Sequence, residues 1–189
     1  MKLLTIQLHM WFFEAETVCK MEINRNGSNG EWTNILEIYT NILDAFKIYG
    51  NVFQVQILYL IIEIFSHALM YVQVFIETGK RGSINKIMTL GVLLIIMLMK
   101  SLLSLTMLCA HCEKFYKTID IAESFCASMM DINLSGEAKR FFKNVRRLKI
   151  ADFQKLSVCG LVCIDAALPL QLSALVATYT VVLLQVAFI

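Results

Sequence analysis

The chain has 189 residues, of which 58% are hydrophobic and 17% are charged. Soluble domains carry about a quarter charged residues, so this composition excludes an ordinary soluble domain. The formal net charge of +2 is too small for a nucleic-acid-binding protein. One proline and eight glycines leave few turn signals for a β-rich fold. We therefore expect an all-α, polytopic helical membrane protein.

Residues 1–51 are expected to form an N-terminal cytoplasmic segment that contains an amphipathic helix. The apolar run 3–13 is too short to cross a bilayer, so we interpret it as a truncated or interfacial helix end. Further along, apolar residues recur at steps of three and four, which is typical of a helix with one apolar face. These residues are Trp32, Ile35, Tyr39, Ile42, Phe46 and Tyr49.

Three segments are long and apolar enough to cross a bilayer, which takes about 20 helical residues. They are 52–77, 88–110 and 166–189, and the first two are joined by the loop 78–87. Three basic residues lie in this loop and seven lie near the spans on the opposite side. Basic residues are enriched on the cytoplasmic side. We therefore expect the loop and the C-terminus to be extracellular, with helical extensions of the spans in the cytoplasm.

Apart from Glu77 at the very end of the first span, the first two spans carry one charge each, Glu63 and Lys100. Both lie at a similar distance from the loop, near the middle of the membrane. A single charge there costs about 2.5–3.5 kcal/mol on insertion scales, and pairing with an opposite charge offsets much of that cost. We therefore predict an intramembrane ion pair between Glu63 and Lys100.

Residues 111–165 are expected to form a cytoplasmic helical anchor. Two apolar stripes at helical spacing support this interpretation, one from Phe115 to Met129 and one from Leu134 to Leu148. A basic cluster accompanies the second stripe. It indicates either a solvated face that also fixes the topology or a surface for acidic lipid or calmodulin. Its members are Lys139, Arg140, Lys143, Arg146, Arg147 and Lys149.

The last span carries polar residues at regular spacing. Asp165 is expected to cap its first turn, which also contains Pro169. Gln171, Thr178 and Gln185 follow at intervals of seven residues, so they share one face of the helix. Two interpretations stay open from the spacing: polar rings that line a pore, or hydrogen bonds to neighbouring helices.

The sequence gives no support for catalysis. It contains no nucleophile elbow, phosphate-binding loop or metalloprotease motif, so we expect no enzyme activity and no catalytic residues. His111 between Cys109 and Cys112 lacks a second ligand pair at suitable spacing. We therefore expect no metal and no cofactor.

The C-terminal sequence resembles the signature of insect gustatory receptors, in which a Thr-Tyr pair is followed by five hydrophobic residues and Gln-Phe. The matching residues are Thr178, Tyr179 and Gln185, while Val186 replaces the phenylalanine. Upstream, the resemblance continues through Cys112-Glu113-Lys114, Phe153-Gln154, Cys159-Gly160, Asp165 and Leu168, and it covers the chain from about Trp32 onward.

This resemblance implies a subunit of a ligand-gated cation channel for taste. Such subunits form homo- or hetero-tetramers in the plasma membrane, and the last of seven helices lines the pore. Carried onto this chain, the pore-lining residues would be Gln171, Thr178, Gln185 and Val186. The three spans correspond to the last three helices, so we expect a partial chain that lacks the first four.

The family's small-molecule tastant is enclosed by the first six helices, to which this chain would contribute His67, Tyr71 and Gln73. The partners implied are the lipid bilayer, a tastant and further receptor subunits, without nucleic acid. The alternative is a small three-span membrane protein with a structural or receptor-accessory role and no channel activity; a transporter fragment is a third interpretation. The sequence does not indicate which tastant is bound.

Overall fold

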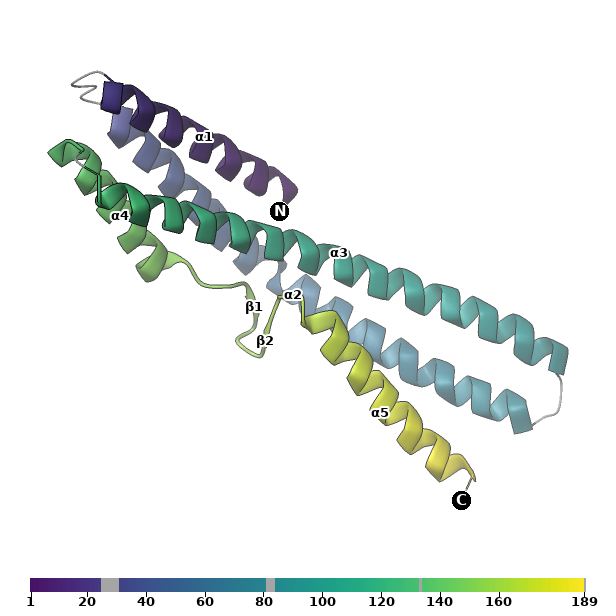
Figure 1. Cartoon of the computed structure of the whole chain (residues 1–189). Coiled ribbons are helices and arrows are strands. Elements are labelled where there is room, and N and C mark those ends of the chain that lie inside the picture. The colour runs from purple at the N-terminus through teal and green to yellow at the C-terminus, as the bar shows by residue number, and fades with distance from the viewer. Residues whose placement is uncertain (25–30, 81–83, 133, 189) are drawn as a thin grey trace. The chain divides into compact units, whose positions relative to one another are not determined.

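The computed structural model describes residues 1–24, 31–80, 84–132 and 134–188. It is helical over 88% of its length, as the all-α class predicts. The order of elements is α1 (Lys2–Asn24), α2 (Glu31–Lys80), α3 (Ile84–Met130), α4 (Gly136–Asp152), β1 (Ser157–Val158), β2 (Val162–Cys163) and α5 (Leu168–Phe188) (Figure 1). Within the described residues, α2, α3 and α5 are long and apolar enough to cross a membrane.

Helices α2 and α3 are much longer than a membrane span requires. They contain 50 and 47 residues, whereas about 20 residues cross the hydrocarbon layer. The apolar segments 52–77 and 88–110 are therefore parts of longer helices, as the periodicity beyond the spans predicted. The expected loop 78–87 is mostly helical, since α2 continues to Lys80 and α3 begins at Ile84. The remaining loop residues, 81–83, lie outside the described part of the chain.

The chain divides into two compact units. The first contains Met1–Val52 and His111–Leu156, and the second contains Phe53–Ala110 and Ser157–Ile189. Residues 157–165, which were expected to belong to the cytoplasmic anchor, fall in the second unit together with the spans. The expected anchor 111–165 is therefore not a single unit. Its last residues form the short strands β1 and β2 instead of helix.

The first unit is a four-helix arrangement with an aromatic core. Trp11 of α1 packs against Tyr39 of α2, with ring centroids 4.7 Å apart, and its indole N–H donates to the carbonyl of Ile35 at 2.7 Å. Trp32 lies 4.8 Å from Phe141 of α4. Most residues of the three predicted apolar stripes are buried here, among them Tyr39, Phe46, Phe115, Ile119 and Val145. Their burial gives the first unit a hydrophobic core of its own.

Helix α1 is a full element of this core. The interpretation of 3–13 as a truncated or interfacial helix end does not hold for its length, because the helix continues to Asn24. Leu8, Trp11 and Ala15 are buried on one face at helical spacing. The polar residues Gln7 and His9, which interrupt the apolar run 3–13, are exposed.

Local sequence also sets the ends of α4. Its N-cap is Ser135, whose hydroxyl accepts the backbone N–H of Ala138 at 3.2 Å. Glu137 stands in the first turn and Lys149 in the last, where each charge is favourable to the helix dipole. The chain then becomes extended at Phe153. This break separates α4 from the short hairpin that follows.

The hairpin pairs Ser157 with Cys163 and Val158 with Val162 in antiparallel register. Its turn contains two residues with positive φ, Cys159 at 50° and Gly160 at 69°. Two consecutive left-handed residues are typical of a type I′ turn, and glycine adopts this conformation without strain. The turn projects Cys159 into an exposed position while Val158 is buried.

Candidate functional site

Asp165 fixes the start of α5. Its Oδ1 atom accepts the backbone N–H groups of Ala167 and Leu168 at 3.0 and 3.1 Å. These groups lack partners within the helix, so the carboxylate satisfies them. The capping role predicted for Asp165 is confirmed, and the regular helix begins at Leu168 with Pro169 in its first turn.

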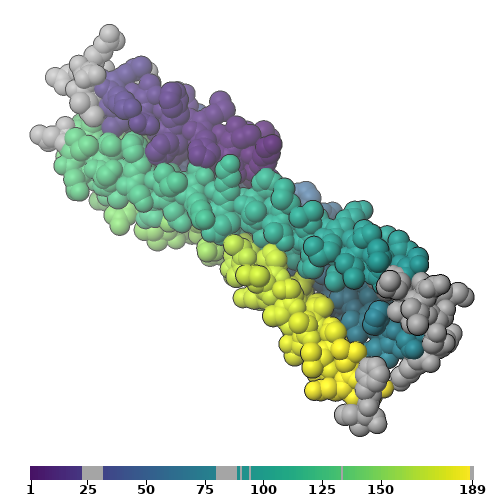
Figure 2. Space-filling view, turned by 45° about the vertical axis from the view of Figure 1, so that its right-hand side comes forward, coloured from purple at the N-terminus to yellow at the C-terminus, as the bar shows by residue number. Residues whose placement is uncertain are grey.

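Helix α5 has two distinct faces. Leu168 and Leu172 are buried against the rest of the second unit, and Val176 and Thr180 continue this packed face with partial burial. Gln171, Thr178 and Gln185 are all exposed on another side of the helix, as their seven-residue spacing predicted. Figure 2 shows one side of the C-terminal helix uncovered along most of its length.

The signature residues differ in their surroundings. Tyr179 packs edge-to-face on Phe65 of α2, with ring centroids 5.5 Å apart. The hydroxyl of Thr178 donates to the carbonyl of Ala174 at 2.9 Å, so its proton is used within α5. Val186 is 74% exposed, about 100° around the helix from Gln185. Thus Tyr179 positions the helix, while Thr178 and Gln185 remain on its uncovered side.

The predicted contact between Glu63 and Lys100 is not formed among the described residues. The Glu63 carboxylate instead lies 3.9 Å from Nδ1 of His67, one turn along the same helix. Lys100 is exposed. Equal distance from the loop set the depth of both charges, but it did not set the direction in which each side chain leaves its helix.

The second unit contains a cavity of about 350 Å³ that is lined by α2, α3 and α5 and is open to the surface. Of the three expected ligand contacts, Tyr71 lines it, whereas His67 and Gln73 do not. His67 stacks on the Tyr71 ring, with centroids 5.8 Å apart. Val176, Thr180 and Leu184 line the cavity from α5, so the helix with the polar stripe also forms one wall of the cavity.

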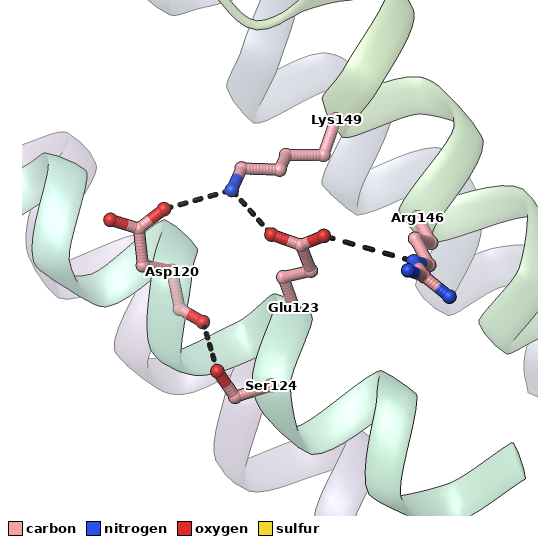
Figure 3. A network of polar contacts seen from close by, with 5 residues as sticks. All are labelled: Asp120, Glu123, Ser124, Arg146 and Lys149. Atoms are coloured by element: carbon pink, nitrogen blue, oxygen red, sulfur yellow. Dashed lines mark hydrogen bonds and ion pairs between the residues drawn. The ribbon is translucent and has the colours of Figure 1, made fainter.

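In the first unit, an ionic network joins α3 to α4 (Figure 3). The ammonium of Lys149 contacts Glu123 and lies 2.8 Å from the carboxylate of Asp120, while Arg146 Nε lies 3.8 Å from Glu123. Burial by itself lowers the pKa of Lys149, but hydrogen bonds to Asp120 and Glu123 outweigh it and the pKa is raised. Two members of the predicted basic cluster, Lys149 and Arg146, therefore pair with acidic residues of α3.

The other basic residues of α4 are on its solvent side. Lys139, Arg140, Lys143 and Arg147 are all exposed. No ion pair is recorded for them among the described residues. They fit the interpretation of a solvated face that also fixes topology.

Sequence reasoning missed the cavity and the hairpin. The cavity depends on side chains from three helices that are distant in sequence, so no local pattern marks it. The hairpin has a local signal, because Cys159-Gly160 places a glycine where a left-handed turn needs it. Among the described residues, no group of three metal-ligating side chains occurs.

The long apolar helices and the exposed apolar surface of the second unit define a multi-pass helical membrane protein. A family model described as 7tm Chemosensory receptor matches residues 1–188, almost the whole chain. The chain therefore belongs to the 7tm chemosensory receptor family, as its resemblance to insect gustatory receptors predicted. No protein of curated function matches it. Membership supports a role as a membrane receptor.

Proposed function

We propose that the chain is part of a ligand-gated cation channel used in taste, and that it supplies the last three spans of a gustatory receptor subunit. The observation that carries this proposal is the uncovered polar stripe of α5. Gln171, Thr178 and Gln185 lie on one exposed face of a helix whose other face is packed. Polar side chains in a spanning helix usually face protein or water, because exposure to lipid is costly.

Four copies of α5 around an axis would remove this cost. The stripe of each copy would face the axis and form successive polar rings at Gln171, Thr178 and Gln185, as in channels that select ions with rings of side chains. Small residues such as Ala174 between the rings would let the helices approach closely. Val186, at the position of the family's phenylalanine, would give a smaller side chain next to the outer ring.

The basic residues support an orientation in which the first unit is cytoplasmic and the C-terminus extracellular, in the plasma membrane. The polar stripe then crosses the membrane with Gln185 at the outer end. The aromatic core of the first unit would serve as the rigid cytoplasmic base of such a subunit.

Cysteine crosslinking tests the arrangement directly. The endogenous cysteines are replaced by serine, and one cysteine is placed at Thr178 on the stripe or at Leu183 on the packed side. In oxidised membranes, the Thr178→Cys chain is expected to form disulfide-linked dimers and the Leu183→Cys chain is not. Equal crosslinking at both positions, or none at either, would contradict the shared axis and favour an accessory membrane protein.

Channel activity is tested by recording cation currents from cells that express the chain. A cationic thiol reagent is expected to block the current after Gln171→Cys or Gln185→Cys substitution. Val176→Cys, on the packed face, is the matched control and is expected to stay unblocked. Absence of any current above background would contradict channel activity by this chain.

A further inference from the structure

The cavity of the second unit has an almost entirely apolar wall. Ala68, Tyr71 and Phe75 of α2 face Gly91 of α3 and Val176 and Thr180 of α5 across about 350 Å³. This volume lies in the range of small-molecule pockets, roughly 300–1,000 Å³. The hydroxyl of Thr180 already donates to the carbonyl of Val176 at 2.8 Å. Tyr71 is then the only other wall residue of the described part with a polar side-chain group.

The cavity follows from where the three helices pack. Ile64 and Ala68 of α2, Leu105 of α3 and Leu172 of α5 are buried. Beyond them, toward the connection between α2 and α3, the wall is made by smaller or more exposed residues. Gly91 has no side chain, and a Cβ atom there would meet only the Phe75 ring, at 3.7 Å. The missing side chain leaves part of this space open.

We infer that this cavity binds a small, largely hydrocarbon molecule with at most one hydroxyl or carbonyl group. A sugar or an amino acid would lose its hydrogen bonds to water on entering and find too few partners in this wall. A hydrocarbon body has no such bonds to lose, and it matches a wall whose accessible surface is almost wholly apolar. The inference deepens the proposed function, on which it rests, by naming the chemical class of the receptor's ligand.

The position of the cavity also gives the ligand a route to the polar stripe. Val176, Thr180 and Leu184 contact the ligand from the packed side of α5, and Thr178 lies on the other side of the same two turns. A molecule between α5 and the other two helices therefore changes the packing contacts of α5 without touching the polar stripe. Such differential contact is what a ligand needs in order to shift a conformational equilibrium.

Photolabelling of the purified chain in nanodiscs tests the inference. The probe is a dodecanol derivative with a diazirine on its chain, and labelled peptides are mapped by mass spectrometry. Saturable labelling of the segments around Tyr71, Gly91 and Val176 is expected, reduced by excess unlabelled dodecanol. Gly91→Phe should fill the cavity and weaken this labelling roughly tenfold or more. Leu93→Phe, on the exposed side of α3, is the matched control and should leave it unchanged.

A second variant fills the cavity from the opposite wall. Val176→Phe should weaken labelling like Gly91→Phe, while Val181→Phe on the exposed side of α5 should not. A parallel arm uses phosphatidylcholine with a diazirine in its acyl chain. Cavity labelling by this lipid alone, labelling that excess dodecanol does not reduce, or equal labelling of all variants would overturn the inference.

The outcome is separable from that of the proposed function. Thr178→Cys crosslinking without saturable labelling would leave the shared axis standing and reject the apolar ligand. Saturable labelling without crosslinking or current would support the apolar ligand and reject the shared axis.

Discussion

Tyr179 of α5 packs edge-to-face on Phe65 of α2, with ring centroids 5.5 Å apart and ring planes at 81°. This contact holds the Tyr179 side of α5 against α2. Thr178 is the neighbouring residue, so its side chain leaves the helix about 100° away from that of Tyr179. With the Tyr179 ring held on α2, Thr178 is turned to the uncovered side. A residue of the family signature thereby has a structural task that is separate from any contact with ions.

Loss of the Tyr179 ring is expected to loosen α5. Tyr179→Leu should destabilise the second unit by about 0.5–1.5 kcal/mol beyond the lost buried area, as for other aromatic pairs. Tyr179→Phe keeps the ring and should be nearly neutral. The buried thiol of Cys109 in this unit reports the change: its modification by maleimide on heating should begin at lower temperature only for Tyr179→Leu. Equal thermal profiles for both variants would argue against this role.

The ionic network predicts a specific cost for removing Lys149. Lys149→Met leaves Glu123 and Asp120 without their ammonium partner and should destabilise the first unit by about 1–2 kcal/mol, between the values for exposed ion pairs and for buried hydrogen bonds to charged groups. Trp11 and Trp32 are the only tryptophans of the chain and both are buried in this unit, so their fluorescence reports its unfolding. Lys143→Met, on the exposed side of α4, is the control and should have little effect.

The raised pKa of Lys149 gives this cost a pH dependence. A raised folded-state pKa means that the stabilisation is fully present below the ordinary lysine pKa of about 10.4 and is lost as the pH rises through the folded-state value. The difference between Lys149→Met and the unsubstituted chain should therefore be constant from about pH 7 to pH 9 and shrink only in stronger alkali. A difference that vanished near neutral pH would contradict the assignment.

Tyr116 supplies a buried hydrogen bond at the end of the first unit. Its hydroxyl oxygen accepts the backbone N–H of Leu156 at 3.0 Å. Tyr116→Phe removes the acceptor and leaves a buried donor unsatisfied, which costs about 1–3 kcal/mol. Tryptophan fluorescence should show a lower unfolding temperature. Tyr59→Phe, at an exposed position of α2, is the control and should leave the unfolding temperature unchanged.

Thiol labelling should separate the six cysteines and test the orientation. Cys159 and Cys163 are exposed, whereas Cys19, Cys109, Cys112 and Cys126 are buried. Burial, with Glu22 and Glu16 nearby, also raises the pKa of the Cys19 thiol, so less of the reactive thiolate is present at neutral pH. A membrane-impermeant maleimide should label Cys159 and Cys163 only after the plasma membrane is opened. Labelling in intact cells would place the hairpin outside and reverse the proposed topology.

The charge on Glu63 offers a direct test of its partner. Glu63→Lys should impair membrane insertion, because it replaces the carboxylate beside His67 with an ammonium group, which the imidazole cannot pair with as it does with the carboxylate. Since the carboxylate faces His67 and Lys100 is exposed, adding Lys100→Glu is expected to give no rescue. Insertion can be followed with a glycosylation tag in the loop between α2 and α3. Full rescue of insertion by the double reversal would instead support the ion pair between positions 63 and 100 that the sequence predicted.

The faces of single helices were predictable from the sequence because they depend on local periodicity. The stripe from Trp32 to Phe46 is buried as its spacing predicts, and Gln171, Thr178 and Gln185 share an exposed face for the same reason. Asp165 also caps the last helix as expected, since a cap acts within one turn. The same local reasoning underestimated the length of α1. Its polar residues interrupt the apolar run in the sequence, but in the structure they are exposed while Leu8, Trp11 and Ala15 are buried.

Composition and helical period by themselves determined the membrane class, the three spanning segments and the polar stripe, because hydrophobic length and spacing are properties of one helix at a time. Tertiary structure alone decided which side chains meet. It placed Lys149 between Asp120 and Glu123 and left a cavity beside Tyr71. These contacts depend on the rotation of each helix and on side chains distant in sequence, and no pattern within one helix specifies either.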